Sequence, residues 1–568
     1  MSHHRHPNRS VRPAWLARLL VFGSVSAVLL LGSGCRTVPS QPATVRQPRI
    51  VNLYNFVRNS DYRLANSEDV LFEATRQQLE LIKPTGLPTT WALQYDALIN
   101  PRYQKLFKEQ VGTNDEIAAW WELPRPLVEK AGLKWRGHDH EWDSTANVGF
   151  SPGYTPEERR KLVDVYMADF KTIFGCYPRT VGSWYIDEVT LEYMAERYGI
   201  VASCNCKDQV GTDGYTLWGG YWNQAYYPSR RNAYMPAQTQ AGQIPVPIFR
   251  MLGSDPIYQG YTPGMWTLEP VYPWAGGSVE WVTWFLQEMI QRPSLAFAYT
   301  QAGQENSFGW DAMKTGLTLQ VALLAWQARA GEIQVMTLAQ AGEWFRAHHA
   351  LTPATAVVCQ TDWKHENRQT VWYDSRFYRL NLLWENGAFY IRDLHLFDEN
   401  VTSVTHDQPL TTTYLAYGTL PVMDAALWSG PEPAGMWPVL LSPTGEKSPL
   451  TPAGPPEIKE LNQTDLSITQ PLLGGGTFTL VCREASVTCS GQDAQGHPLH
   501  WAWDLVGGPA QKSALHTCAP QRLTYQSATT TYHLLLSPNL GSCEQLPNGT
   551  VRLNSNPAGK LGMTLGGF

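Results

Sequence analysis

Acidic residues recur directly after the strands that the sequence predicts. They are Asp96 after "WALQY", Glu122 at the end of "EIAAWWE", Asp187 and Glu188 after "GSWYI", Asp255 after "FRMLGS" and Glu305 after "AFAYTQAGQ". In a parallel barrel these strand ends share one rim, so acids distant in sequence can converge on one cleft. Glycosidic cleavage needs one protonated carboxyl and one charged carboxylate. We therefore predict Glu305 and Asp187 as the catalytic pair, with Asp255 as the alternative catalytic acid. Asp96 and Glu122 are predicted to bind substrate.

Each of these acids also has a structural interpretation. Asp187 precedes a helical stretch and could be its N-cap, accepting free N–H groups of the first turn. Asp255 precedes a proline, and Asp-Pro favours a turn. Asp96 could cap the helix that follows it, and Glu122 could pair with Arg125. Both interpretations stay open at the level of sequence.

A Gly-broken aromatic segment, "DGYTLWGGYWNQAYYPSRRNAY" (213–234), is the best candidate for substrate binding. Its rings and amides suit stacking on sugars and hydrogen bonding to them, although an aromatic surface loop is the alternative. The chain holds 23 Trp, 26 Tyr and 17 Phe, so rings are plentiful. The predicted substrate-binding residues outside the acids are Trp218, Trp222, Asn223, Tyr227, Arg250 and Trp310.

The stretch "GHDHEWD" raises the question of a metal site. His138 and His140 alternate as on one face of a strand, and Asp143 lies near them, so a divalent ion is conceivable. A solvated polar loop explains the stretch better, because the barrel region supplies few further histidines. We predict no cofactor and keep this trio as the weaker alternative.

Composition limits the classes of partner. Charged residues make up 17% of the 568 residues and the formal net charge is −6. Capture of nucleic acid needs clustered Lys and Arg, so we predict a carbohydrate partner and no nucleic acid.

The N-terminus reads as a targeting segment. Arginines precede an apolar run over residues 19–31, and "LGSGC" follows, ending at Cys35. This pattern resembles a bacterial lipoprotein signal over 1–34, with a lipidated Cys35 and a Pro-containing tether over 35–48. A plain signal peptide or a short membrane anchor is the alternative. Either way we expect an exported protein, membrane-anchored by lipid at the outer membrane, the cell surface or in the periplasm.

Export would place the remaining cysteines in an oxidising compartment. Cys482 with Cys489, and Cys518 with Cys543, lie close enough in sequence to be candidate bridges, although sequence alone does not fix their connectivity.

Alternating apolar runs and amphipathic stretches fill residues 49–350 and predict a parallel (β/α)7 or (β/α)8 barrel. The expected strands are 50–57, 89–95, 116–122, 181–186, 200–205, 246–252, 294–300 and 333–337. Period-two patterns then predict one or two antiparallel β-sandwich domains. We expect a β domain over 351–430, a Pro-rich connection over 431–470 and a β-sandwich over 471–568.

One stretch carries a family resemblance: "FGCYPRTVGSWYIDEVTLEYMAERYGI" (174–200). It resembles the fourth-strand region of polysaccharide-deacetylase-like barrels, which have a Gly-x-x-Pro turn, a strand with an active-site residue and a helix that ends in Gly. The matching positions are Gly175, Pro178, Asp187 and Gly199. The wider superfamily includes family 57 and family 38 glycoside hydrolases, which implies seven strands and β domains downstream. Residues 49–350 also resemble exported bacterial proteins classed as domains of unknown function.

The departures from this family bear on the chemistry. Metal-dependent members carry an Asp-Asp pair after the first strand and a His-x-x-x-His motif soon after. Here the first strand leads into "NFVRNSDYRLANSED", and the barrel region has no His-x-x-x-His. Without those ligands no metal is available to activate water. We therefore predict a glycoside hydrolase ahead of a metal-dependent carbohydrate deacetylase, with a noncatalytic glycan-binding lipoprotein as the third possibility.

Overall fold

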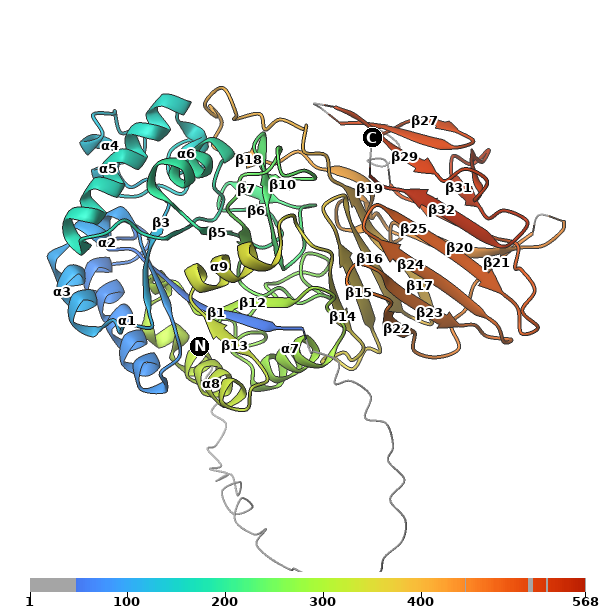
Figure 1. Ribbon diagram of the computed structural model, residues 1–568, viewed down its shortest axis with the longest axis horizontal. Helices are drawn as coiled ribbons and strands as arrows, with labels where there is room; N and C mark the ends of the chain where they lie inside the picture. The colour runs from blue at the N-terminus through green and yellow to red at the C-terminus, as the bar shows by residue number, and fades with distance from the viewer. Residues whose placement is uncertain (1–46, 445, 509–513, 528–529, 567–568) are drawn as a thin grey trace, which may run out of the picture. The chain divides into compact units, whose positions relative to one another are not determined.

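The computed structural model describes residues 47–444, 446–508, 514–527 and 530–566 (Figure 1). The predicted signal, Cys35 and nearly all of the tether lie outside these residues. Among the helices of the described part, none is long and apolar enough to cross a membrane.

A nearly closed parallel sheet forms the first half of the fold (Figure 1). Seven of its eight parallel strands are β1 (Arg49–Val57), β2 (Thr90–Leu93), β3 (Glu116–Trp120), β4 (Thr180–Gly182), β5 (Ala202–Asn205), β11 (Ile248–Arg250) and β12 (Ala298–Ala302). They follow one another in chain order, and β12 returns to pair with β1. Between the described residues of β11 and β12 no strand pairing occurs; β11 pairs there with the antiparallel β8 (Ala225–Tyr226). Every predicted barrel strand overlaps an observed one, the last being β13 (Gln334–Met336), which pairs in parallel with β1.

Helices pack around this sheet, and the last of them buries Leu338, Ala341 and Phe345 in the same cluster as the barrel-interior residues. The helices are α1 (Ser67–Ile82), α2 (Tyr95–Ile99), α3 (Pro101–Gln110), α4 (Arg125–Lys130), α5 (Pro156–Phe174), α6 (Glu188–Tyr198), α7 (Val279–Gln291), α8 (Trp310–Arg329) and α9 (Leu338–His348). Because helices and barrel interior enclose both faces, β1 is buried at all nine positions and reads as a continuous apolar run. Local sequence sets the helix ends around β4: α5 stops at Gly175 and α6 at Gly199, both with positive φ that glycine adopts without strain.

Two antiparallel sheets form the second half. A ten-stranded sheet comprises β14 (Thr355–Cys359), β15 (Gln369–Asp374), β16 (Tyr378–Glu385), β17 (Ala388–Leu396), β19 (Leu420–Asp424), β20 (Gly435–Leu441), β21 (Lys447–Pro449), β26 (Trp501–Val506), β30 (Ser542–Gln545) and β31 (Val551–Asn554). An eight-stranded sheet comprises β22 (Glu457–Glu460), β23 (Leu466–Pro471), β24 (Thr477–Arg483), β25 (Ser486–Gln492), β27 (Leu515–Ala519), β28 (Arg522–Gln526), β29 (Thr531–Leu536) and β32 (Lys560–Thr564). Phe478 of the second sheet packs edge-on against Trp501 of the first, with ring centroids 4.7 Å apart.

The chain crosses repeatedly between these two sheets. The predicted Pro-rich connection, 431–470, contains β20, β21, β22 and most of β23. Both predicted parts contribute to the ten-stranded sheet, because β26, β30 and β31 of the predicted sandwich join β14 to β17 and β19 there, whereas the eight-stranded sheet takes its strands from residues after 456.

The candidate disulfides lie between neighbouring strands, and the eight cysteines of the described part are free thiols. In the register of β24 and β25, Cys482 faces Val487 and Cys489 faces Leu480, so these two thiols are not directly opposite. The Sγ of Cys543 donates to the carbonyl of Ala519, the neighbour of Cys518, at 2.6 Å. Both bridges stay predictions.

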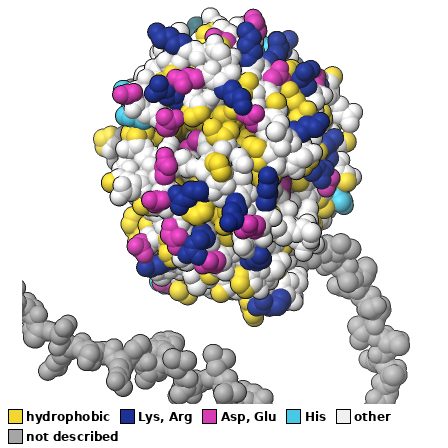
Figure 2. Space-filling model, turned by 90° about the vertical axis from the view of Figure 1, so that its left-hand side faces the viewer, with side chains coloured by type: hydrophobic (Ala, Val, Ile, Leu, Met, Phe, Trp, Pro, Cys, Tyr) yellow, Lys and Arg dark blue, Asp and Glu magenta, His cyan; other side chains and the backbone are white. Residues whose placement is uncertain are grey.

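Figure 2 shows the face of the molecule that carries the early barrel helices. On this face Lys and Arg side chains alternate with Asp and Glu and do not gather in a patch of one sign.

Candidate functional site

The first residue after β1, Arg58, links two of the predicted acids. Its guanidinium is buried, with Nε and Nη2 each donating to Glu122 at 2.8 Å and Nη1 donating to Glu305 Oε2 at 2.9 Å. Gln94, which follows β2, donates to Glu122 Oε2 at 3.0 Å. Glu122 follows β3 and Glu305 follows β12, so four strand ends meet at one point of the rim. The ion pair of Glu122 with Arg58 replaces the predicted pairing with Arg125.

Glu305 is the acid in this cluster whose pKa is shifted toward neutral pH. Burial raises its pKa to about 7; the Arg58 guanidinium opposes this rise and the Glu122 charge adds to it. The residue is 6% exposed, so it is nearly buried at the rim. A carboxyl with a pKa near 7 can donate a proton at neutral pH and recover it afterwards.

Aromatic rings surround the guanidinium of Arg58. Phe56 stacks on Trp120 with centroids 4.0 Å apart, and Trp184 meets the Phe56 ring edge-on at 5.0 Å. The Trp142 ring lies 4.4 Å from Arg58 Cζ. These apolar surfaces exclude water from the ion pairs, and this exclusion is why burial dominates the electrostatics of Glu305.

Asp96 organises the loop that carries Arg58. Its Oδ2 accepts the backbone N–H groups of Asn59 and Ser60, each at 3.0 Å, and burial raises its pKa to about 6. Asp96 is not the predicted helix cap, because α2 begins one residue earlier, at Tyr95. These hydrogen bonds fix the loop next to Arg58. The predicted contact of Asp96 with substrate stays a prediction.

The structure does not bring Asp187 into contact with Glu305. Asp187 is the N-cap of α6, and its carboxylate accepts from the Thr190 backbone and from Arg159 Nη1, each at 2.9 Å, and from the Ser151 and Thr190 hydroxyls. Burial alone would raise its pKa, but Arg159 and these hydrogen bonds hold the pKa below its usual value. Both Asp187 and Arg159 are fully buried. The geometry favours the capping interpretation.

Asp255 is likewise enclosed in an ordinary turn. Its Oδ1 accepts the N–H groups of Ile257 and Tyr258, and its Oδ2 accepts the indole N–H groups of Trp281 and Trp363 at 2.9 and 3.0 Å. The carboxylate is fully buried. With four donors on two oxygens it has no capacity left for a substrate.

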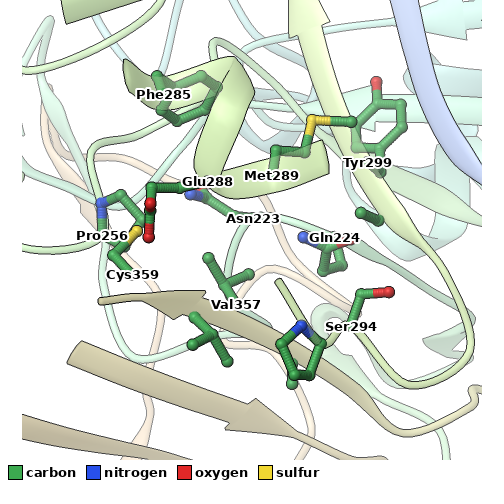
Figure 3. A pocket seen from close by; sticks show the side chains of 14 residues that line it. Asn223, Gln224, Pro256, Phe285, Glu288, Met289, Ser294, Tyr299, Val357 and Cys359 are labelled. Atoms are coloured by element: carbon green, nitrogen blue, oxygen red, sulfur yellow. The ribbon is translucent and has the colours of Figure 1, made fainter. Parts of the chain in front are cut away.

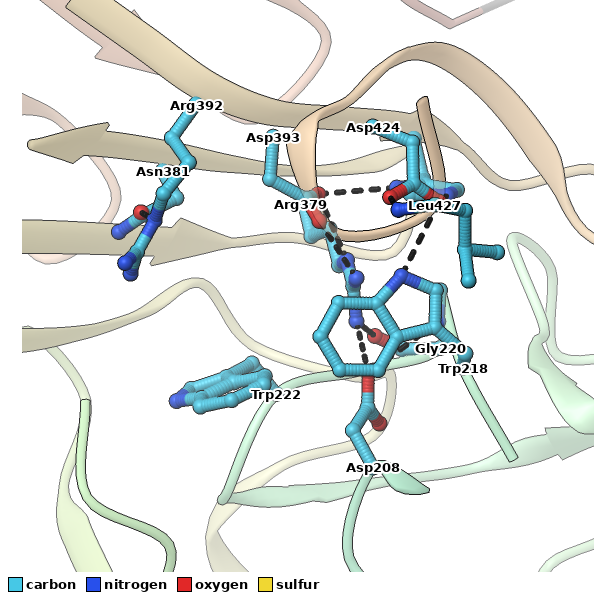
Figure 4. Close-up of polar contacts among 12 residues, drawn as sticks. Asp208, Trp218, Gly220, Trp222, Arg379, Asn381, Arg392, Asp393, Asp424 and Leu427 are labelled. Carbon is cyan, nitrogen blue, oxygen red and sulfur yellow. Dashed lines mark hydrogen bonds and ion pairs between the residues drawn. The ribbon is translucent and has the colours of Figure 1, made fainter. Parts of the chain in front are cut away.

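The aromatic segment 213–234 is mostly interior, which corrects its prediction as a sugar-binding loop. The Trp222 ring stacks on Trp372 of β15 with centroids 3.9 Å apart and an interplanar angle of 2°. The Trp218 indole donates to Asp424 at 3.0 Å, beside the buried ion pairs of Arg379 (Figure 4). The ten-stranded sheet covers these rings, so their polar edges bind protein groups. Composition alone could not distinguish coverage by a sheet from exposure to a ligand.

Three further predicted binding residues have protein partners instead. The Tyr227 hydroxyl donates to the His349 carbonyl at 2.8 Å. Arg250 is buried and forms an ion pair with Asp208. Trp310 is partly buried against the core at the start of α8.

Asn223 lines a largely apolar pocket between α7, β12 and β14 (Figure 3). Its Nδ2 donates to the Ser254 carbonyl at 2.7 Å. The acid of this pocket, Glu288, is engaged by Arg292 and by the Gln360 backbone. The predicted rim acids are not among the residues that line it.

The metal alternative does not fit the described residues. His138 Nδ1 lies 2.7 Å from Asp143 Oδ2, while the His140 ring stacks on Tyr62 at 4.5 Å. Within the described ranges, no group of three or more His, Cys, Asp or Glu side chains is placed to hold a metal ion. His138 is exposed, whereas Asp143 is buried and its Oδ1 accepts the backbone N–H and the hydroxyl of Thr145.

Sequence reasoning missed the basic residues of the rim and one acid. Arg58 directly follows β1, and Lys207 comes two residues after β5. A search for basic as well as acidic residues after the predicted strands would have included both. Lys207 Nζ lies 3.9 Å from Glu269 Oε2, and the Thr267 hydroxyl donates to that oxygen at 2.8 Å. Burial raises the pKa of Tyr272, and the charges of Glu269 and Glu305 both add to the rise.

Comparison with known proteins supports the fold. No protein-family model and no curated protein match the chain. A solved structure from Parabacteroides distasonis, named as a candidate glycoside hydrolase/deacetylase, aligns with a TM-score of 0.50 and 16% identity, over 68% of this chain and 91% of that one. At this identity the match shows a shared fold only. It confirms the predicted resemblance to the deacetylase-like and glycoside hydrolase barrels at that level.

Two further structures are more distant. A candidate polysaccharide deacetylase from Mycobacterium smegmatis has a TM-score of 0.33 and 13% identity, over 53% of this chain and 91% of that one. The 4-alpha-glucanotransferase from Thermococcus litoralis has a TM-score of 0.27 and 9% identity, over 91% and 97%. At these scores neither match carries an argument.

The raised pKa of Glu305 predicts a pH-dependent loss of stability. Its folded pKa of about 7 lies above the ordinary value of 4.5, so the folded state binds the proton more tightly than the unfolded chain. This contribution is complete below about pH 4.5 and is lost as pH rises through about 7. We expect the unfolding free energy of Glu305→Gln, measured in urea, to lack this decline. Parallel pH curves for the two proteins would contradict the assignment.

Proposed function

We propose that the chain is a carbohydrate-processing enzyme, specifically a glycoside hydrolase that uses Glu305 as its general acid. The observation that carries the proposal is a nearly buried carboxyl with a pKa of about 7, placed on the rim where four strand ends converge. The shared fold with a structure named for glycoside hydrolase and deacetylase chemistry supports the substrate class.

Each rim residue then has a role that its contacts suggest. Glu305 gives its proton to the leaving oxygen of the glycosidic bond. Glu122 binds Arg58 through two oxygens and thereby fixes the one guanidinium nitrogen that contacts Glu305. Glu269, held by Lys207 and Thr267, is the proposed charged carboxylate that attacks carbon or activates water. Glu269 replaces Asp187 in this role because Asp187 is enclosed.

Product analysis tests the reaction class. Residues 36–568 would be incubated with a panel of soluble polysaccharides, and new reducing ends and free acetate would be measured separately. We expect reducing ends, with a rate that falls above about pH 7 because the donor must be protonated. Acetate without reducing ends would indicate a deacetylase instead. Binding without either product would indicate a noncatalytic glycan-binding protein.

We also propose, from residues 1–35 alone, that the enzyme is exported as a lipoprotein. Mass analysis of the mature N-terminus should find a lipidated Cys35. An unprocessed Met1 would contradict this.

A further inference from the structure

Among the described residues, five large aromatic side chains are exposed, and three of them belong to ring clusters that contact Arg58 or include the short helix after Glu305. The exposed fractions are 46% for Tyr62, 47% for Trp274 and 39% for Phe308. Exposing a large ring is unfavourable in water, and such rings gather where a ligand will cover them. Their positions relative to Glu305 suggest what that ligand is.

Trp274 and Phe308 belong to one ring cluster with Tyr272 between them. The Tyr272 ring lies 5.6 Å from Trp274 and 6.5 Å from Phe308. We call these three residues the outer platform. It adjoins the acid in the chain, because Phe308 ends the short helix η3 (Asn306–Phe308), which begins directly after Glu305.

Tyr62 belongs to a second cluster with His140 and Trp142, the inner platform. Tyr62 stacks on His140 with centroids 4.5 Å apart and lies 5.8 Å from Trp142. Trp142 in turn lies against Arg58, the residue that contacts Glu305. One residue, Arg58, therefore lies between the inner platform and the Glu305 carboxyl, while the outer platform includes Phe308 of the helix that begins directly after Glu305.

The loop of the outer platform is held in place before any ligand arrives. Gln320 of α8 donates to the carbonyls of Leu268 and Gly276 at 2.7 and 2.6 Å, at both ends of the loop. The Trp274 indole donates to the Met265 carbonyl at 2.9 Å. A side chain at Gly276 would meet backbone atoms at 2.4 Å, so only glycine permits this packing. A preorganised ring binds with little loss of conformational freedom.

The charges beside the platforms are already paired. Arg58 binds Glu122 and Glu305, and Arg63 binds Asp61 at 2.6 Å. An anionic ligand would have to compete for these cations, whereas the apolar face of an uncharged sugar needs only the rings.

We propose that the inner and outer platforms bind an uncharged saccharide chain that passes over Glu305, with sugar rings stacked on Tyr62 and on Trp274. This inference rests on the proposed function and deepens it: the substrate is a chain with sugar units on both sides of the acid, and not a single sugar.

Binding to the Glu305→Gln background tests the proposal without turnover. The probes are uncharged polysaccharides (glucans, xylan and galactomannan) in affinity electrophoresis. We expect the background protein to bind one of them, and Trp274→Ala and Tyr62→Ala each to weaken that binding about 10-fold, the effect of losing one ring contact. Trp274→Phe, which keeps a ring, should retain most of the affinity.

The matched control is Trp326→Ala, because Trp326 is 56% exposed on α8 but belongs to neither platform. It should bind like the background protein. Equal affinity in all variants, or no binding to any of the probes, would overturn the inference. If binding depends on Trp274 and Tyr62 but the native enzyme forms no product, the proposed reaction is wrong and the proposed saccharide-binding platforms are supported. If products form but neither ring substitution weakens binding, only the proposal of the two binding platforms is wrong.

Discussion

Glu305→Gln should lower kcat by about 10²–10⁴-fold on the polysaccharide that the enzyme cleaves, which is the usual contribution of a positioned general acid. The amide keeps the size of the side chain and can still face Arg58, but it cannot deliver a proton to a leaving oxygen. The Arg58–Glu122 pair stays intact, so the fold should persist. Reducing-end release under saturating substrate measures the effect, and circular dichroism confirms the fold.

Glu280→Gln is the matched control for this experiment. Glu280 lies in the first turn of α7 with its side chain 68% exposed. The same chemical change at that position should leave kcat unaltered. Full activity in Glu305→Gln would remove the general-acid role, whatever the state of the binding platforms.

The barrel could be predicted because its strands are local apolar runs between amphipathic helices. A run such as 50–57, buried on both faces, needs no knowledge of its partners to be recognised. The pairing of the later strands could not be predicted in this way. Segments 477–489 and 499–506 both read as strands, yet the first supplies the eight-stranded sheet and the second the ten-stranded sheet. Membership of a sheet is decided by long-range packing, which period-two patterns do not encode.

The rim shows the same division between local and long-range information. The strand-end rule predicted that Glu305 and Glu122 share one rim, because parallel strands place their ends on one side, and both acids contact Arg58 there. It also selected Asp187 and Asp255. Both follow strands, but Asp187 is the N-cap of α6 and Asp255 accepts hydrogen bonds within a closed turn. Arg58, the residue that joins the two retained acids, was missed because only carboxyls were considered.

Aromatic residues were the least predictable part of the site. The densest aromatic segment, 213–234, is covered by the ten-stranded sheet, whereas the exposed rings Tyr62 and Trp274 come from loops with fewer rings. Tyr and Trp serve equally well in a core and at a binding surface, since each has an apolar body and a polar edge. Their exposure depends on which element packs above them, and the sequence does not state that.

Asp187→Asn should lower the free energy of unfolding by about 3–5 kcal/mol, the typical cost of breaking a buried ion pair. The amide can still accept the Thr190 N–H, so the cap of α6 survives, but Arg159 keeps a buried charge without a counterion. Carbonyls of Tyr154 and Thr405 also hold this guanidinium, at 2.8 and 2.7 Å, and neither neutralises it. Urea denaturation measures the loss.

The exposed acid Asp311, in the first turn of α8 with its side chain 92% exposed, provides the control for that loss. Asp311→Asn should change stability by less than about 0.5 kcal/mol. At a temperature where Asp187→Asn remains folded, its kcat should stay near that of the native enzyme, because Asp187 is sealed behind Arg159 and the Ser151 hydroxyl. A loss of turnover without a loss of stability would return Asp187 to the catalytic pair and displace Glu269 from it.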